Sequence, residues 1–156
     1  MRTQIEVITA SEEHAEGIGK VVRDAIRRVN AKDYPPHEIN RLVSNFSTSN
    51  ILDFLKQRLT IVAMHDNVVA GTGALQGPEI KSVFVSPDLH RRGVGSVLLG
   101  ELERVASKRG VQELVVSSSL SAVKFYSALG YVEQSRKFFG EEETVVMIKS
   151  AISPSP

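Results

Sequence analysis

The chain has 156 residues, of which 42% are hydrophobic and 24% are charged, and its 19 basic and 18 acidic residues give a net charge near +1. This length and composition predict one globular domain with a substantial core, and the balanced charge argues against a protein built to coat nucleic acid. Because the chain contains no cysteine, a disulfide scaffold, a thiolate nucleophile and a cysteine-bound metal are excluded.

Targeting and metal-binding patterns are missing from the sequence. The segment Met1–Glu6 has no apolar stretch of the kind found in signal peptides, and no apolar run approaches the length of a membrane span. The four histidines show no metal-ligand spacing. We therefore expect a cytoplasmic protein without a membrane partner and without a metal.

The first third of the chain predicts a strand followed by helices. Residues 5–8 alternate as a strand does, and apolar residues at helical spacing mark a helix over about 15–29. The prolines in residues 34–36 break that helix. Two short helices are predicted next, one over about 39–46 and one over about 49–55.

The middle of the chain predicts three strands and a long helix. Residues 60–65 and 68–75 read as strands joined by the two-residue hairpin signal Asp66-Asn67. The turn after them leads into a strand over 79–85. A long amphipathic helix runs from about 93 to 108, where a basic last turn meets a glycine.

The last part of the chain predicts a strand over 112–117, a helix over 122–129 and a final strand pair. The pair comprises 131–133 and 144–148, with a charged loop or extended hairpin tip at 136–143 between them. Mixed strands and helices in this order indicate an α+β fold.

One domain boundary follows from this pattern of elements. We expect a single domain over residues 1–149. The remaining residues, 150–156, end in Ser-Pro-Ser-Pro and predict a disordered tail.

The strand ending at Val85 runs into a basic turn with two glycines that opens the long helix. A helix N-terminus presents unpaired N–H groups at the positive end of its dipole, so this turn predicts a site for a phosphate-bearing ligand. We expect Gly93 and Gly95 to let the anion approach the backbone. The spacing fits neither a P-loop nor a dinucleotide fingerprint. The pair Gly71 and Gly73, inside a predicted strand, favours a bulge or close packing.

Two motifs identify a resemblance. Residues 90–95, His-Arg-Arg-Gly-Val-Gly, match the loop [QR]-x-x-G-x-[GA] except at the first position. Residues 119–131 match N-x-x-A-x-x-F-Y-x-x-L-G-[FY] except that Ser119 replaces the leading Asn. Two such motifs in this order, about 25 residues apart, resemble the GNAT N-acetyltransferase superfamily. The resemblance covers about residues 60–135 well.

The resemblance implies a three-layer α/β/α fold with a mixed, mostly antiparallel sheet that is splayed where acetyl-CoA, the cosubstrate, binds. The strand at 83–85 would separate from its parallel neighbour at 112–117 and bond the pantetheine arm as an added strand does. One amide there would polarise the thioester carbonyl. The implied cofactor-binding residues are Val83, Phe84, Val85, His90, Arg91, Arg92, Gly93, Val94, Gly95, Ser96 and Ser119.

Two residues are candidates for proton transfer. Glu79 lies 11 residues before His90, a spacing at which family members place a general base. Tyr126, from the Phe-Tyr pair of the second motif, would be the general acid for the departing thiolate. The alternatives stay open: Glu79 as a solvated residue paired with Lys81, and Tyr126 as a core residue.

Two functions are compatible with these motifs. The first is an N-acetyltransferase that transfers the acetyl group directly to a primary amine, since a chain without cysteine cannot form an acyl-cysteine. The second is a non-catalytic acyl-CoA-binding sensor or regulatory domain. For the first we expect a small amine or a short peptide end as acceptor and no nucleic-acid partner, and we leave a homodimer open.

The acceptor pocket is predicted from position in the chain. Tyr34 and His37 flank two prolines between the first helix and the next pair, where a stiff segment could cover the cleft beside Glu79. Phe139, in the last hairpin, would face them. The alternative is that this segment only breaks a helix and that the phenylalanine only packs the hairpin.

Overall fold

The computed structural model describes residues 4–140 and 142–151, with the backbone alone for Asn30 and Phe139. One sheet of seven strands has the spatial order β1-β2-β3-β4-β5-β7-β6. The strands are β1 (Glu6–Thr9), β2 (Leu59–His65), β3 (Val68–Gln76), β4 (Glu79–Val85), β5 (Glu113–Ser118), β6 (Val132–Phe139) and β7 (Glu142–Ser150). Among the described strands only β4 and β5 pair in parallel, so the sheet is mixed and mostly antiparallel, as the sequence predicts.

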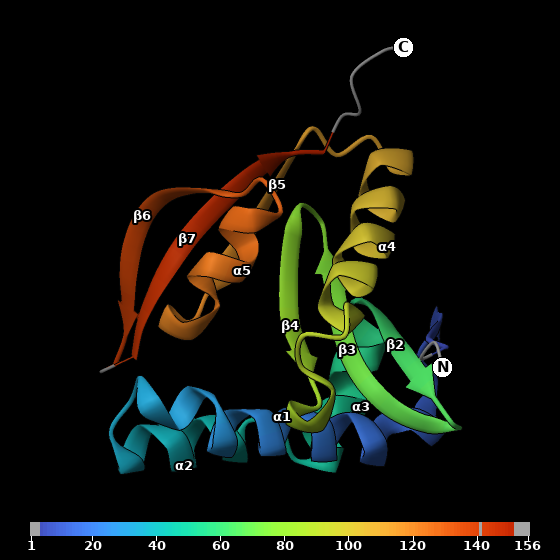
Figure 1. The fold of residues 1–156 in the computed structure, drawn as a ribbon, viewed down its shortest axis with the longest axis vertical. Coiled ribbons are helices and arrows are strands. Elements are labelled where there is room, and N and C mark those ends of the chain that lie inside the picture. The colour runs from blue at the N-terminus through green and yellow to red at the C-terminus, as the bar shows by residue number, and fades with distance from the viewer. Residues whose placement is uncertain (1–3, 141, 152–156) are drawn as a thin grey trace.

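Five helices cover the sheet. They are α1 (Ala15–Arg28), α2 (Pro36–Ser44), α3 (Thr48–Gln57), α4 (Val94–Lys108) and α5 (Val123–Ala128). Four single-turn 3-10 helices accompany them: η1 (Glu12–His14), η2 (Asn30–Lys32), η3 (Pro87–Leu89) and η4 (Leu120–Ala122). Figure 1 shows α1 and α2 along one end of this view, and it shows β5, β6 and β7 on the opposite side of β4 from α4.

The core consists of two apolar layers, one on each face of the sheet. Neighbouring residues of β2 point to opposite faces, because side chains alternate along a strand. Ile61 and Ala63 pack with α4 and α5, whereas Val62 packs with α1, α2 and α3. The result is the three-layer α/β/α arrangement of an α+β fold.

Two glycines of β3 bring α4 close to the sheet. A Cβ on Gly71 would lie 2.9 Å from Leu98, and one on Gly73 would lie 3.0 Å from Leu102. The register between β3 and β4 also shifts at Gly73. Both outcomes expected for this pair, a bulge and close packing, are therefore present.

The hairpin between β2 and β3 confirms the turn predicted from its sequence. Asp66 and Asn67 have φ angles of 51° and 63°, the left-handed values that a two-residue hairpin of this type requires.

The C-terminal strands are longer than the sequence predicts. Most of the charged segment at 136–143 is an extended hairpin, one of the two expected forms, because β6 and β7 pair along their length as far as Phe139 and Glu142. At the other end, β7 extends to Ser150, one residue beyond the expected domain boundary, and the next residue, Ala151, is buried. Residues 152–156, the rest of the expected tail, lie outside the described residues.

Candidate active site

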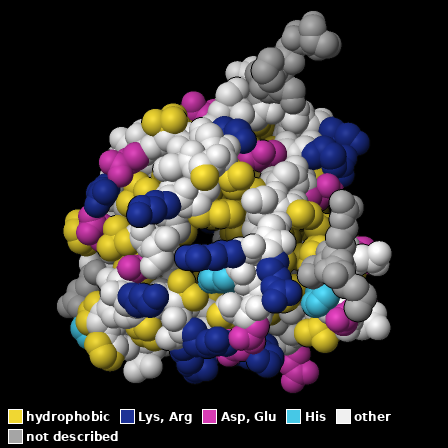
Figure 2. Space-filling model, viewed as in Figure 1, with side chains coloured by type: hydrophobic (Ala, Val, Ile, Leu, Met, Phe, Trp, Pro, Cys, Tyr) yellow, Lys and Arg dark blue, Asp and Glu magenta, His cyan; other side chains and the backbone are white. Residues whose placement is uncertain are grey.

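A cavity of about 1050 Å³ lies where β4 and β5 separate. The parallel pairing joins only Glu79 with Val115 and Ile80 with Val116. Beyond these pairs both strands line the cavity, which confirms the splay that the sequence resemblance implies. In the space-filling view an opening lies near the middle of the face, bordered by basic, histidine and hydrophobic side chains (Figure 2).

A β-bulge coincides with the separation of the strands. Lys81 pairs with Ala74 and Phe84 with Thr72, so two residues of β4 oppose one residue of β3. Ser82, inside the bulge, has a φ of 54°, which is uncommon for a residue with a side chain. A bulge bends its strand. From Lys81 onward, one edge of β4 is therefore left without a strand partner among the described residues.

The loop after β4 and the first turn of α4, residues 86–96, have a backbone geometry that suits an anion, and we call this segment the anion loop. Arg91 and Gly93 have φ angles of 65° and 81°, and Gly93 is the N-cap of α4. Left-handed residues in such a turn direct successive N–H groups into one concavity, here at the positive end of a 15-residue helix. The loop residues His90, Arg91, Gly93, Val94, Gly95 and Ser96 line the cavity.

The two glycines of this loop have different surroundings, and the close approach of an anion to their backbone stays a prediction. A Cβ on Gly93 would meet no described atom within 4 Å, so glycine is needed there for its left-handed φ. A Cβ on Gly95 would lie 2.8 Å from the ring of Phe125. The absence of a side chain at Gly95 thus serves the packing of α4 against α5.

The basic residues of the loop are not equivalent. Arg91 is exposed and lines the cavity, whereas Arg92 is exposed and is not on the cavity wall. His90, which replaces the usual first residue of the motif, places Nε2 3.3 Å from the carbonyl oxygen of Val85. This contact holds the loop against the end of β4.

Tyr126 lies on the cavity wall, 5% exposed, with Phe125 and Tyr131 packed edge-on against its ring. Its hydroxyl group has no hydrogen-bond partner among the described residues and is not one of the fully enclosed polar atoms. Burial raises the pKa of this hydroxyl well above its usual value of 10. The hydroxyl therefore stays protonated at neutral pH.

Glu79 also lines the cavity, at the paired end of β4. Its side chain is 55% exposed, and its Oε2 lies 3.5 Å from Nζ of Lys81. The ion pair foreseen in the sequence therefore exists beside a carboxylate that can still reach the cavity.

Two of the three predicted acceptor residues, Tyr34 and His37, are not on the cavity wall. Tyr34 is buried in the apolar layer beneath the sheet, its hydroxyl donates to the carbonyl oxygen of Glu143 at 3.2 Å, and burial raises its pKa to about 12. His37 is exposed on α2. Neither is on the cavity wall, because the segment packs sideways against β7 rather than over the opening. The side chain of Phe139 lies outside the described part.

Other residues form that side of the cavity. Apolar side chains come from α1, α2 and the turn after each helix, and polar ones come from β7 and from the residue between α3 and β2. They are Ala25, Ile26, Val29, Leu42, Phe46, Arg58, Glu142 and Thr144. No pattern in the sequence distinguishes them, since apolar residues at helical spacing predict core as readily as a pocket.

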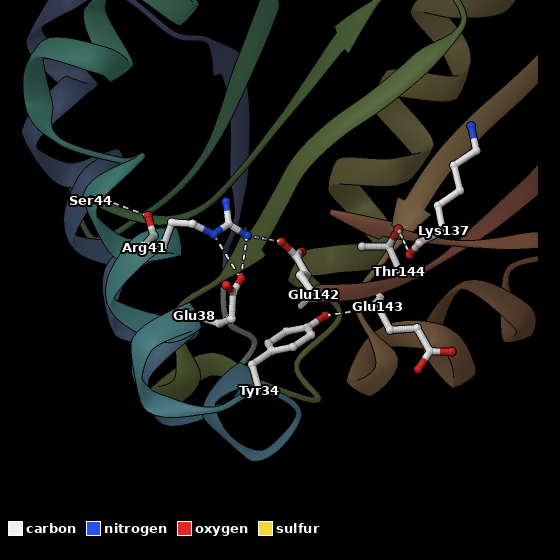
Figure 3. A network of polar contacts seen from close by, with 8 residues as sticks. All are labelled: Tyr34, Glu38, Arg41, Ser44, Lys137, Glu142, Glu143 and Thr144. Atoms are coloured by element: carbon white, nitrogen blue, oxygen red, sulfur yellow. Dashed lines mark hydrogen bonds and ion pairs between the residues drawn. The ribbon is translucent and has the colours of Figure 1, made fainter. Parts of the chain in front are cut away.

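A cluster of charges joins α2 to β7 beside the cavity (Figure 3). Nε and Nη2 of Arg41 lie 3.0 and 2.8 Å from Oε2 of Glu38, which is 6% exposed. The same Nη2 lies 3.0 Å from Oε2 of Glu142. Burial raises the pKa of Glu142, whereas Arg41 acts in the opposite direction. This cluster fixes the position of β7 against the helices.

The described residues contain neither a candidate membrane span nor a candidate metal-binding cluster. No helix there is both long enough and apolar enough to cross a membrane. No group of three or more His, Asp or Glu side chains in the same residues is arranged to hold a metal ion.

The family model described as an acetyltransferase (GNAT) domain matches residues 30–149, which include β4, the anion loop, α4 and α5. The chain belongs to the GNAT acetyltransferase family. A curated relative, an uncharacterised N-acetyltransferase of Methanocaldococcus jannaschii, is 34% identical over 76 residues, or 47% of this chain. A Bacillus subtilis protein named as an acetyltransferase is 27% identical over 82 residues, or 50% of this chain. The chain spans 34% and 56% of the length of these two relatives.

Solved structures of GNAT proteins share the fold along the whole chain. A GCN5-related N-acetyltransferase of Rhodopseudomonas palustris is 26% identical with a TM-score of 0.89, and the match covers 96% of this chain and 98% of that one. PaiA N-acetyltransferase of Thermoplasma acidophilum, solved in complex with coenzyme A, is 20% identical with a TM-score of 0.82 and coverages of 94% and 99%.

Proposed function

We propose that this GNAT protein is an N-acetyltransferase that takes an acetyl group from acetyl-CoA and transfers it to a primary amine by direct attack. The observation that carries the proposal is the position of the cavity. It lies at the separation of β4 and β5, and its wall includes both the anion loop and the buried Tyr126. Two GNAT neighbours of this fold were solved with coenzyme A or acetyl-CoA.

The residues of the cavity fit acetyl-CoA at both ends. N–H groups at the start of α4, with Arg91, would hold the pyrophosphate. The unpaired edge of β4 at 81–85 offers backbone groups to the pantetheine amides, as an exposed strand edge does to an added strand. That placement brings the thioester between β4 and Tyr126.

The transfer then needs two proton movements. The amine nitrogen forms a C–N bond with the carbonyl carbon as the C–S bond breaks. Tyr126 would give its proton to the departing thiolate, and the proton lost by the amine would go to Glu79, directly or through water. The exposed carboxylate of Glu79 favours the water route. Because the chain has no cysteine, no acyl-cysteine forms.

The alternative is an acyl-CoA-binding sensor without turnover. One experiment separates the two functions: release of the CoA thiol from acetyl-CoA, followed with a thiol reagent across a panel of amino acids, polyamines, aminoglycosides, peptide N-termini and lysine peptides. Amine-dependent thiol release supports the acetyltransferase. Binding of acetyl-CoA by calorimetry without release for any amine would instead support the sensor. Glu79→Gln should lower the rate most at low pH, where the amine depends most on a base.

A further inference from the structure

Arg58 is a half-buried cation on the cavity wall that has no carboxylate partner among the described residues. It follows α3 and precedes β2. Its Nη2 donates to Oγ of Ser82 at 3.0 Å, and its Cζ lies 4.3 Å from the centroid of the Phe54 ring. The serine and the ring hold the guanidinium in place without neutralising its charge.

The donors of this guanidinium are only partly used. An arginine has five N–H bonds, and one of them is directed to Ser82. Nε is fully enclosed and unpartnered, and so is Oγ1 of Thr60. Both residues line a second cavity of about 20 Å³, which has room for about one water molecule. The other bonds of Nη1 and Nη2 have no described partner, and the large cavity borders this side chain.

The acidic residues of the cavity wall are already paired elsewhere. Glu79 pairs with Lys81, and Glu142 pairs with Arg41. Burying a cation without a counter-charge is unfavourable. Arg58 is therefore available to pair with an anionic group of a ligand. A planar guanidinium stacked on a ring presents its edge, and that edge matches the two oxygens of a carboxylate.

We propose that Arg58 binds a carboxylate of the acceptor, so that the acceptor is an amino acid; this rests on the proposed acetyl transfer. Ser82, which orients Arg58, lies at the start of the unpaired edge of β4 where the thioester is expected. A carboxylate there lies near the attacking amine, as in an amino acid. The phosphates of CoA are assigned to the loop beyond the other end of that edge.

The remaining wall specifies the kind of side chain. Five apolar residues from α1, α2 and the turns that follow them face the same cavity: Ala25, Ile26, Val29, Leu42 and Phe46. An apolar side chain would bury its surface against them. Leucine is therefore a suitable probe acceptor.

The first test needs no turnover. Calorimetry on protein saturated with CoA compares N-acetyl-leucine with N-acetyl-leucinamide, which lacks the carboxylate. The wild type should bind the carboxylate about 10–100-fold more tightly, the range for hydrogen bonds to a charged group. Arg58→Gln should abolish that preference without weakening amide binding, and Arg58→Lys should retain part of it. Arg104→Gln, which removes an exposed arginine from α4, should leave it unchanged.

The second test uses the reaction. In Arg58→Gln, kcat/KM for leucine should fall about 10–100-fold, while that for 3-methylbutylamine, which is leucine without its carboxylate, should stay the same. Should Arg58→Gln fail to fold, Ser82→Ala is the second variant. It keeps the charge of Arg58 but removes the hydrogen bond that orients it, so it should reduce the preference for leucine over 3-methylbutylamine.

Equal wild-type affinities for the two acetylated probes, or no binding of either, would overturn the proposal. So would equal losses for the acid and the amide in Arg58→Gln. The absence of thiol release with every amine would refute the acetyltransferase function instead, and calorimetry would still decide the role of Arg58.

Discussion

Two buried tyrosines differ in what their hydroxyl groups contact. The hydroxyl of Tyr131 donates to Oε2 of Glu103 at 2.7 Å, and this residue is not on the cavity wall. That of Tyr126 has no described partner, and this residue lies on the cavity wall. Because the rings pack together, with centroids 5.5 Å apart, one is a matched control for the other.

The first prediction uses this pair. Tyr126→Phe should lower kcat by roughly 10²–10⁴, since the thiolate would leave without its proton donor. Its affinity for acetyl-CoA by calorimetry and its thermal stability should change little. Tyr131→Phe should instead lose up to about 2 kcal/mol of stability with kcat unchanged, because it loses a hydrogen bond to a charged group. If Tyr126→Phe turns over like the wild type, the proton comes from another group.

The glycines of the loop give a second prediction. In Gly95→Ala the new Cβ would meet the Phe125 ring at 2.8 Å, so the ring must move. We expect a loss of about 1–3 kcal/mol in the free energy of unfolding, as for overpacked cores. Adding Phe125→Leu should recover part of that loss, giving a favourable coupling in a double-mutant cycle measured by urea unfolding. Additive losses would contradict the packing role of Gly95.

Different kinds of contact hold the elements on the two sides of the cavity in place. α4 lies against glycines of β3, whereas β7 is tied to α2 through Arg41, Glu38 and Glu142. The contribution of an ion pair to stability depends on pH, whereas that of an apolar contact does not.

The third prediction concerns that dependence. Burial raises the pKa of Glu142 above 4.5, so the folded protein binds its proton more readily than the unfolded chain does. In the window just above pH 4.5, the stability contributed by this group therefore falls as pH rises. The free energy of unfolding of wild type minus that of Glu142→Gln, from urea titrations between about pH 4 and 8, should decrease across that window.

Glu101 provides the control of opposite sign. Its hydrogen bond with Arg104 lowers its pKa, so its contribution is complete above pH 4.5 and is lost as pH falls toward the lowered value. The free energy of unfolding of wild type minus that of Glu101→Gln should rise with pH below 4.5. If the difference for Glu142→Gln instead rises with pH, the ion pair with Arg41 has a larger effect on the pKa of Glu142 than burial has.

At the scale of the whole molecule, the sheet is joined by few residue pairs between β4 and β5. Only two residue pairs join β4 to β5, whereas six join β5 to β7. In Figure 1, β5, β6, β7 and α5 stand together on one side of this junction. A ligand that enters the junction contacts both sides and should stabilise the whole chain, because it binds only the folded state.

The fourth prediction follows from that geometry. With CoA at about 100 times its Kd, the free energy of unfolding should rise by about 2.7 kcal/mol. Hydrogen exchange followed by mass spectrometry should slow in peptides covering 79–96 and 113–118, while peptides covering β1 exchange at the same rate. Protection confined to 79–96 would show that the ligand does not bridge the two strands.

The sequence by itself determined most of the elements and the turn before α4. Local signals suffice for these: side-chain periodicity, the Asp66-Asn67 turn, and a strand that runs into Arg91 and Gly93 at a helix start. The two motifs around His90 and Tyr126 also indicated the family. The cofactor-binding residues that they imply stay a prediction, and all of them except Arg92 lie on the cavity wall.

Only the tertiary structure decided which residues line the cavity opposite the loop before α4. The place of Tyr34 and His37 in the chain predicts that they line it, but the path of the backbone puts Tyr34 in the apolar layer and His37 on an exposed face of α2. Arg58, Ser82 and Glu142 are distant in sequence and carry no motif, and they share one cavity because a bulge in β4 opens the sheet between α3 and β7. Contacts between such distant residues depend on packing, and no local pattern of residues encodes them.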